Sequence, residues 1–357
     1  MSQNESYHVN ESLRNDLRLR KILDELPEFA SRYFYANEFS LSARTRVAYA
    51  YDIRTFFRYI ITKNPSLQYM QVRDITIAHL EQLSVHDIES YLSYLKCYHP
   101  DEQEHRTIHN TPTGIARKLS CLRSFFDYYT GIGEMKRNPA ARVSTPKIHT
   151  KEIIQLDPDE VEILLSGIEN GSDKISKHQK KYLDKTRLRD LAITTLLLGT
   201  GIRISECVGL DIQDVNFKDN SIKITRKGGN EQIVFFNNEV PYVLEDYLHE
   251  QRLNLIPEKG SEDALFLSLK NNRISVDAIE KMIVKYARMY VPHKRITPHK
   301  LRSTFGTQLY QETGDLYLVA ETLGHSSVDT SKKYASMKER KRLVAQTIQL
   351  RAQNRES

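Results

Sequence analysis

Four residues near the carboxyl end of this 357-residue chain are of types that bind phosphate or attack it. His299 and Arg302 lie three residues apart, His325 follows 23 residues after Arg302, and Tyr334 comes nine residues later. Imidazole and guanidinium groups donate hydrogen bonds to phosphate oxygens, and a phenol is a nucleophile. Alone, each residue has an ordinary role as a solvated, capping or packing side chain. Together, their order and spacing predict a phosphate-binding site with a nucleophile beside it.

Two predicted helices must position these residues. Thr297 suits an N-cap and Pro298 suits a first helical position, so a helix should begin there. The first His and the Arg then share one face, close to the free N–H groups and positive end of the helix dipole. Residues 316–323 form a second apolar-periodic helix, which should end at Gly324 in a left-handed cap. The second His follows that cap directly.

A further constellation lies upstream. Residues 196–206 indicate an apolar helix, a break punctuated by glycines, and a new helix led by Arg203. Glu206 lies one turn after Arg203. It forms either a plain salt bridge on the helix surface or a contact that holds the guanidinium in place for a ligand.

A β-hairpin is predicted next. Apolar residues alternate with polar ones at Ile222 and Ile224, residues 226–230 suit a turn, and the pattern returns with Ile233 and Phe235. Lys227 falls at the tip of this hairpin. A cation there either keeps the turn soluble or projects away from the sheet toward a ligand.

Six of these residues match, in order, the complete active-site set of one enzyme family: Arg203, Lys227, His299, Arg302, His325 and Tyr334. The flanking strings at 200–206, 299–302 and 323–327 match as well, together with 138–140 and 145–147. On these residues the chain resembles the tyrosine recombinase (phage integrase-like) family through most of residues 150–340. Within the family it most resembles single-chain Xer recombinases of the XerS type.

The resemblance implies a site-specific recombinase that cuts and rejoins DNA through a 3′-phosphotyrosine intermediate and a Holliday junction. The implied roles are nucleophile for Tyr334, phosphate binding for Arg203, Arg302 and His325, general acid for Lys227 and proton transfer near the tyrosine for His299. We find no Walker-type loop and no carboxylate cluster suited to Mg²⁺, so we expect no metal and no cofactor.

The expected partners follow from the same resemblance. They are a double-stranded DNA recombination site and three further copies of the chain, which form a homotetramer on two DNA sites. A division-linked DNA translocase is a further candidate partner. The expected biological role is resolution of chromosome dimers, and the alternative is integration or excision of a phage or mobile element.

The expected fold is mainly α with a small antiparallel β-sheet, in the two-domain architecture of tyrosine recombinases. Residues 1–148 should form a helical, SAM-like core-binding domain that clamps DNA, and residues 149–357 a mixed α/β catalytic domain. Residues 142–155 are polar, contain proline and lack periodicity, which is typical of an interdomain linker. The resemblance implies that a charged helix at 338–355 docks on a neighbouring protomer.

The first domain should be almost entirely helical. Residues 53–61 carry the apolar stripe of an amphipathic helix, and a second helix should run from Thr111 to Gly131. Basic residues occupy polar positions of these helices, where a solvated surface is the ordinary interpretation. Because a DNA-cutting domain follows, we expect them to contact phosphates. The candidates are Arg44, Arg46, Arg54, Arg58, Arg117, Lys118 and Arg123.

Bulk composition adds little. The chain has 52 Lys and Arg against 46 Asp and Glu, a net charge of +6, so DNA binding must come from arranged patches. Three Cys, at 97, 121 and 207, have no metal-binding spacing and are expected to be free thiols. No apolar run approaches 18 residues, so we expect a cytoplasmic protein without a membrane partner.

The sequence departs from the family pattern at two places, and two other functions are compatible with it. Ser303 stands where many members carry another His, and residues 169–185 are longer and more polar than in compact Xer enzymes. One rival is a type IB topoisomerase-like enzyme, which uses the same chemistry without strand exchange. The other is a DNA-binding accessory protein without activity.

Overall fold

The computed structural model describes residues 7–64, 67, 69–99, 107–148, 153–171, 183–226, 229–324 and 330. The chain divides into two compact units, residues 1–150 and 151–357. Between them, residues 142–148 and 153–155 contain no helix or strand. Val143 is buried in the core of the first unit, and Leu156 is buried in the second.

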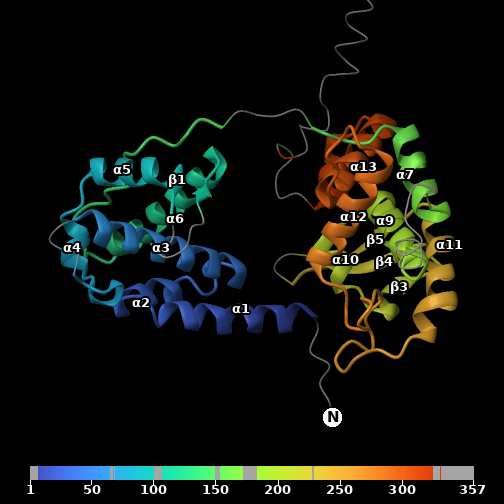
Figure 1. Cartoon of the computed structure of the whole chain (residues 1–357), viewed down its shortest axis with the longest axis horizontal. Coiled ribbons are helices and arrows are strands. Elements are labelled where there is room, and N and C mark those ends of the chain that lie inside the picture. Colours follow the sequence, from blue (N-terminus) through green and yellow to red (C-terminus); the bar gives the residue numbers. More distant parts are fainter. Residues whose placement is uncertain are drawn as a thin grey trace, which may run out of the picture. The chain divides into compact units, whose positions relative to one another are not determined.

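The first unit is a bundle of helices (Figure 1). In chain order they are α1 (Tyr7–Leu23), α2 (Glu28–Ala36), α3 (Ala43–Lys63), α4 (Ile77–Glu81), α5 (Val85–Leu95) and α6 (Pro112–Gly131), with a 3₁₀ turn at Val72–Asp74. Helices α3 and α6 pack together through buried aromatic rings. Phe56 and Phe126 meet edge to face with centroids 6.0 Å apart, as do Phe57 and Phe125 at the same distance.

Both helices predicted in this unit are confirmed, and their first turns show why they begin where they do. Ser42 caps α3 by accepting a hydrogen bond from the Thr45 N–H, and Thr111 caps α6 by accepting one from the Gly114 N–H. The sequence does not predict the two short strands of this unit. Strands β1 (Cys97–Tyr98) and β2 (Ile108–His109) pair antiparallel, but two residue pairs are too few to produce a readable alternation.

The second unit surrounds a buried helix. Its elements are α7 (Pro158–Asn170), α9 (Arg187–Thr200), α10 (Ile204–Gly209), β3 (Val215–Asn216), β4 (Ser221–Thr225), β5 (Glu231–Phe235), α11 (Glu239–Asp246), α12 (Val276–Tyr290), α13 (Pro298–Thr313) and α14 (Leu316–Leu323). Short 3₁₀ or π turns lie at Ile212–Asp214, Tyr247–Gln251 and Arg252–Asn254. Helix α9 is buried along nearly its whole length, because α7, α11 and α13 pack around it. The mainly α fold with a small antiparallel sheet is confirmed.

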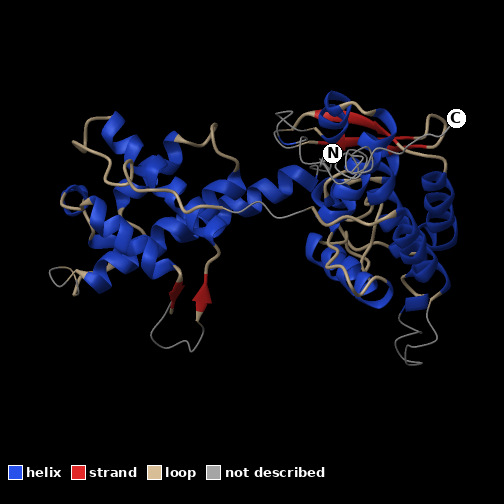
Figure 2. Ribbon diagram, turned by 90° about the horizontal axis from the view of Figure 1, so that it is seen from above, coloured by secondary structure: helices blue, strands red, loops and turns tan. Residues whose placement is uncertain are grey.

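The sheet has the strand order β3-β4-β5 and is antiparallel throughout. Its strands lie together at one edge of this unit (Figure 2). The predicted hairpin is confirmed, but the apolar pattern of its second strand is misleading. Ile233 and Phe235 are exposed, and Val234 between them is buried opposite Ile222. The cause is pairing: the register places Val234 on the face that Ile222 and Ile224 turn toward the core.

Two further observations bear on the sequence predictions. The three cysteines are free thiols, with Cys121 and Cys207 buried and Cys97 exposed. None of the helices in the described part of the chain is long and apolar enough to cross a membrane.

Candidate active site

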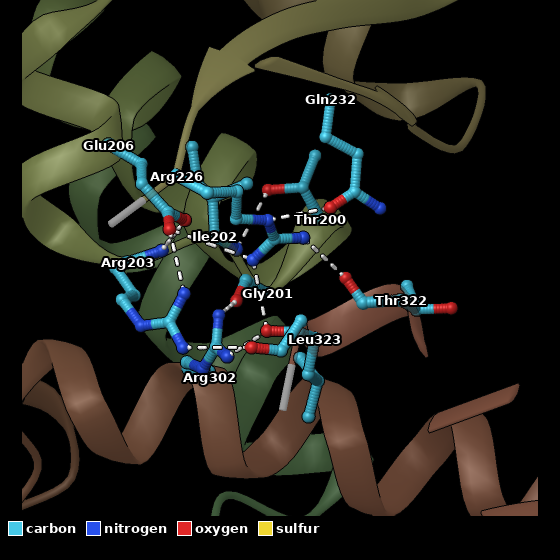
Figure 3. Close-up of polar contacts among 11 residues, drawn as sticks. Thr200, Gly201, Ile202, Arg203, Glu206, Arg226, Gln232, Arg302, Thr322 and Leu323 are labelled. Atoms are coloured by element: carbon cyan, nitrogen blue, oxygen red, sulfur yellow. Dashed lines mark hydrogen bonds and ion pairs between the residues drawn. The ribbon is translucent and has the colours of Figure 1, made fainter. Parts of the chain in front are cut away.

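Two candidate residues of the second unit, Arg203 and Arg302, meet Arg226 at the carboxyl end of α14. Arg203 follows the end of α9, Arg226 follows strand β4, and Arg302 lies in α13. All three guanidinium groups point toward backbone carbonyls at the end of α14 (Figure 3). Three segments that are distant in sequence therefore place three cations in one small region.

The break after α9 depends on a glycine. Gly201 ends the helix with φ +61°, in the left-handed region that favours glycine. A Cβ at this position would lie 2.3 Å from a ring carbon of Phe305 and 2.9 Å from Leu323. Only glycine therefore lets α13 and α14 pack this closely against the end of α9. This packing brings Arg302 to the Gly201 carbonyl.

Arg203 is held by Glu206. Its Nη1 donates to Glu206 Oε1 at 2.8 Å, and its backbone N–H donates to Oε2 of the same carboxylate at 2.7 Å. Glu206 is 3% exposed, whereas the Arg203 side chain is 37% exposed. The Nη2 group of Arg203 also donates to the Gly324 carbonyl at 3.2 Å. Glu206 and the Gly324 carbonyl thus anchor the guanidinium, while part of the Arg203 side chain remains accessible to solvent.

Arg302 is the most deeply placed of the three cations. It is 4% exposed, its Nη1 donates to the Gly201 carbonyl at 2.6 Å, and its Nη2 donates to the Leu323 carbonyl. Helix α13 begins at Pro298, as the sequence predicts, with Thr297 in the N-cap position. Thr297 makes no side-chain capping bond, so its contribution is its extended backbone alone.

His299 lies on the exposed part of the first turn of α13. Its carbonyl accepts a hydrogen bond from the Ser303 hydroxyl at 3.0 Å. Ser303 is 3% exposed, so this position, which departs from the family pattern, is occupied by a hydroxyl satisfied within its own helix.

Arg226 is a residue that the sequence did not single out as functional. It donates through Nε to Gln232 at 2.7 Å, through Nη1 to the Leu323 carbonyl at 2.9 Å, and through Nη2 to the Thr322 carbonyl at 2.8 Å. Burial lowers the pKa of Arg226, and the nearby cation of Arg203 acts in the same direction, while Glu206 opposes them. The sequence signal was only a basic residue at the start of a turn.

The electrostatics of the region favour an anion. Arg203 and Arg226 lie close to one buried carboxylate, Glu206, and all three guanidinium groups hydrogen-bond carbonyls at the negative end of the α14 dipole. Carbonyls and the carboxylate hold the cations together without neutralising all of their charge. A phosphate group is the ligand that such a cluster recognises, because guanidinium N–H groups match its oxygens.

Three predicted site residues, Lys227, His325 and Tyr334, lie outside the described residues. The predicted helix at 338–355 and residues 172–182 of the insertion lie outside them as well. Within the described ranges, no group of three or more His, Cys, Asp or Glu side chains could hold a metal ion.

The basic residues of the first unit have varied surroundings. Arg44 is exposed. Arg46 is 7% exposed and pairs with Asp16 at 3.0 Å. The remaining candidates all contact other parts of the unit: Arg54 and Arg58 pair with Glu25, Arg117 and Lys118 pair with buried Asp52, and Arg123 donates to the Ala140 and Val143 carbonyls and to Thr145. Most of these cations therefore have partners within the unit, although Arg117 remains exposed.

Comparison with known proteins shows the family of the chain. The model of the phage integrase family matches residues 155–341. The chain is 34% identical to the tyrosine recombinase XerS of Streptococcus mutans over 354 residues, covering 90% of this chain and 96% of the relative. It is 32% identical to XerS of Streptococcus agalactiae over 346 residues, with the same coverage.

Solved structures share the fold. The recombinase XerH in a post-cleavage complex with its palindromic difH substrate superposes with a TM-score of 0.62 at 21% identity, covering 86% of this chain and 80% of that one. A lambda integrase dimer bound to a COC′ core site gives a TM-score of 0.57 at 16% identity, covering 86% and 76%.

The chain therefore belongs to the phage integrase family, the tyrosine recombinases. It is a site-specific DNA recombinase, an enzyme that cuts and rejoins DNA. The relatives that it resembles over most of its length include proteins named XerS.

Proposed function

We propose that this recombinase resolves chromosome dimers by cutting DNA at a fixed site through a 3′-phosphotyrosine on Tyr334. The observation that carries the proposal is the placement of Arg203 and Arg302 at the end of α14, where both guanidinium groups hydrogen-bond carbonyls of residues 323–324. A scissile phosphate bound there would be held through its two non-bridging oxygens.

The chemical step follows from these residue types. The phenolic oxygen of Tyr334 forms a bond to phosphorus while the bond from phosphorus to the 5′-oxygen breaks. His299 accepts the phenol proton, Lys227 donates a proton to the leaving 5′-oxygen, and His325 donates a hydrogen bond to the phosphate. The new phosphodiester stores the energy of the old one, so the reverse attack by a 5′-hydroxyl reseals a strand without ATP.

Strand exchange requires more than one active site. We propose that four protomers assemble on two DNA sites and exchange strands in pairs through a Holliday junction, with the segment at 338–355 docking between protomers. A division-linked DNA translocase is the proposed activator. The likeness to relatives named XerS supports dimer resolution over integration of a mobile element.

A nicked suicide duplex tests the proposal. Cleavage next to the nick releases a short oligonucleotide, so the covalent intermediate accumulates and survives SDS. If no adduct forms, the recombinase function is excluded and the alternative of a DNA-binding accessory protein without activity is favoured. Strand exchange between two labelled sites separates a recombinase from a topoisomerase-like enzyme, which would relax supercoils without joining the two DNAs. Mapping trapped adducts on the chromosome of the source organism then decides the role, since dimer resolution requires one fixed chromosomal site.

Lys227→Ala is expected to bind DNA normally but to cleave it about 10²–10⁴-fold more slowly, because the leaving 5′-oxygen has lost its proton donor. A duplex with sulfur in place of that oxygen should cleave at nearly the wild-type rate, since a thiolate leaves without protonation. The rates are measured as adduct formation on the two substrates. A Lys227→Ala enzyme that stays slow on the thio substrate would remove this residue from the general-acid role.

We further propose that the first unit clamps DNA through the exposed members of its basic set, chiefly Arg44 and Arg117. Arg44 and Arg46 lie two residues apart in α3 and form a matched pair, since one is exposed and the other is buried against Asp16. They should therefore respond differently to the same substitution.

Arg44→Gln is expected to weaken DNA binding and to reduce the slope of log affinity against log salt by about one, because one phosphate contact is lost. Arg46→Gln should instead destabilise the unit by about 1–3 kcal/mol, because Asp16 loses a charged hydrogen-bond partner. Fluorescence anisotropy at several salt concentrations and thermal melting measure the two effects. An unchanged salt slope in Arg44→Gln would exclude Arg44 as a phosphate contact.

A further inference from the structure

Arg226 ties the β4–β5 hairpin to the carboxyl end of α14. Its backbone N–H closes the turn by donating to the Asn230 carbonyl at 2.7 Å, so the residue sits at the base of the β4–β5 turn. Its guanidinium reaches in two directions: Nε donates across the hairpin to Gln232, and both Nη groups donate to α14. All three nitrogen atoms are thus used to connect two elements (Figure 3).

We propose that Arg226 is a positioning residue for the recombination reaction: it fixes the base of the hairpin against α14 and thereby sets the reach of Lys227, the next residue. The inference rests on the proposed function, in which Lys227 is the general acid. No role in contacting DNA is assigned to Arg226 itself.

The burial of Arg226 argues against a simple turn residue. Its side chain is 9% exposed, and a buried guanidinium is costly unless its N–H groups are satisfied. Here two main-chain carbonyls and one side-chain amide oxygen satisfy it, and Glu206 Oε1 lies 3.6 Å from Nη1. A cation that only kept the turn soluble would remain in water. This one is held in a single geometry that a shorter or non-planar side chain cannot reproduce.

Gly324 provides an independent sign of the same contact. Its φ of +59° ends α14 in the left-handed region. A Cβ on Gly324 would lie 2.7 Å from the Arg226 Cζ and 2.8 Å from its Nη1. The left-handed backbone favours glycine there, and the absence of a Cβ leaves the space that the Arg226 guanidinium occupies.

The contact also connects the hairpin that carries the proposed general acid to the proposed phosphate-binding residues. The Leu323 carbonyl accepts hydrogen bonds from Arg226 and from Arg302, so the anchor of the hairpin and a phosphate-binding cation share one acceptor. A displacement of about 1 Å in a reacting group can cost about 10²-fold in rate. Loss of Arg226 should therefore affect the proton transfer that Lys227 performs more than the binding of DNA.

The experiment compares cleavage of nicked duplexes with oxygen or sulfur at the 5′ leaving position. Arg226→Gln is expected to slow the oxygen substrate about 10²-fold and to cleave the sulfur substrate within about threefold of wild type. Arg226→Lys should be nearly as slow on oxygen, because its charge is retained but the three-way geometry is lost. Gln232→Ala is a milder variant that removes one of the three acceptors of Arg226. It should cleave the oxygen substrate about threefold to tenfold more slowly than wild type, and the sulfur substrate should restore the rate.

Lys223→Gln is the matched control. Lys223 lies on the same strand, is exposed, and pairs with Glu231 at 3.4 Å, so its replacement removes a hairpin cation without touching α14. It should cleave both substrates like wild type. DNA binding by each variant, measured by fluorescence anisotropy, reports that the proteins are folded.

The outcomes separate this inference from the function on which it rests. A Lys227→Ala enzyme that sulfur does not rescue would overturn the general-acid assignment itself. If sulfur rescues Lys227→Ala but not Arg226→Gln, Arg226 does not act through the general acid and the inference fails. Full activity of Arg226→Lys on the oxygen substrate would also overturn it, because charge alone would then suffice.

Discussion

Replacing Tyr334 with Phe should abolish the covalent protein–DNA adduct on a nicked suicide duplex while leaving DNA affinity within about twofold. The substitution removes one oxygen atom, which is the proposed nucleophile, and phenylalanine has no group that can attack phosphorus. The phosphate-binding cations are unchanged, so binding should persist. SDS gels measure the adduct, and fluorescence anisotropy measures the affinity.

Tyr317→Phe supplies the control for this prediction. Tyr317 lies in α14 and is 74% exposed, so the same loss of a hydroxyl there should leave the adduct at the wild-type level. Peptide mapping of the wild-type adduct should place the nucleotide on the peptide that contains Tyr334. An adduct that still forms with Tyr334→Phe, or one mapped to another tyrosine, would show that the nucleophile is assigned wrongly.

The second large effect is expected for Arg302→Lys. Lysine keeps the positive charge, but a single ammonium group cannot bind the Gly201 and Leu323 carbonyls and also hold a phosphate oxygen in the geometry of the planar guanidinium. Removing one donor that stabilises charge in a transition state typically costs about 10²–10³-fold in rate. We therefore expect adduct formation to slow by this factor on both oxygen and sulfur substrates.

The lack of rescue by sulfur distinguishes Arg302 from the general acid, since a better leaving group does not replace a phosphate ligand. Arg295→Lys, at an exposed position shortly before α13, is the matched control and should retain wild-type cleavage. Because Arg302 is 4% exposed, it should contribute little to the initial encounter with DNA, and affinity should change little. A rate within about threefold of wild type would exclude Arg302 from the phosphate site.

Helix boundaries near the site could be predicted from sequence because they depend on local chemistry. Pro298 begins α13 and Gly324 ends α14, as expected from the restricted φ of proline and the left-handed tolerance of glycine. The stripe at 53–61 predicted a buried helix face, since its period matches that of an α-helix. Such signals involve residues within a few positions of one another, so no knowledge of the tertiary fold is needed to interpret them.

The surroundings of the basic residues could not be predicted in the same way. Arg117 and Lys118 lie on polar positions of α6, yet both bind Asp52, a buried residue 65 positions before Arg117. The hairpin shows the same limitation. Ile233 and Phe235 are apolar but exposed, because the strand register places Val234 on the buried face instead. Whether a side chain meets water or a distant segment depends on packing that a periodic pattern does not contain.

For this protein the sequence alone determined the order of the six candidate catalytic residues, the elements that carry the described ones, and with them the resemblance to tyrosine recombinases. The tertiary structure alone decided that the end of α14 gathers Arg203, Arg226 and Arg302. Most of the acceptors there are main-chain carbonyls, together with the buried carboxylate of Glu206 and the amide oxygen of Gln232. Because every residue has a carbonyl, no residue type marks which ones will accept, and only the fold selects them.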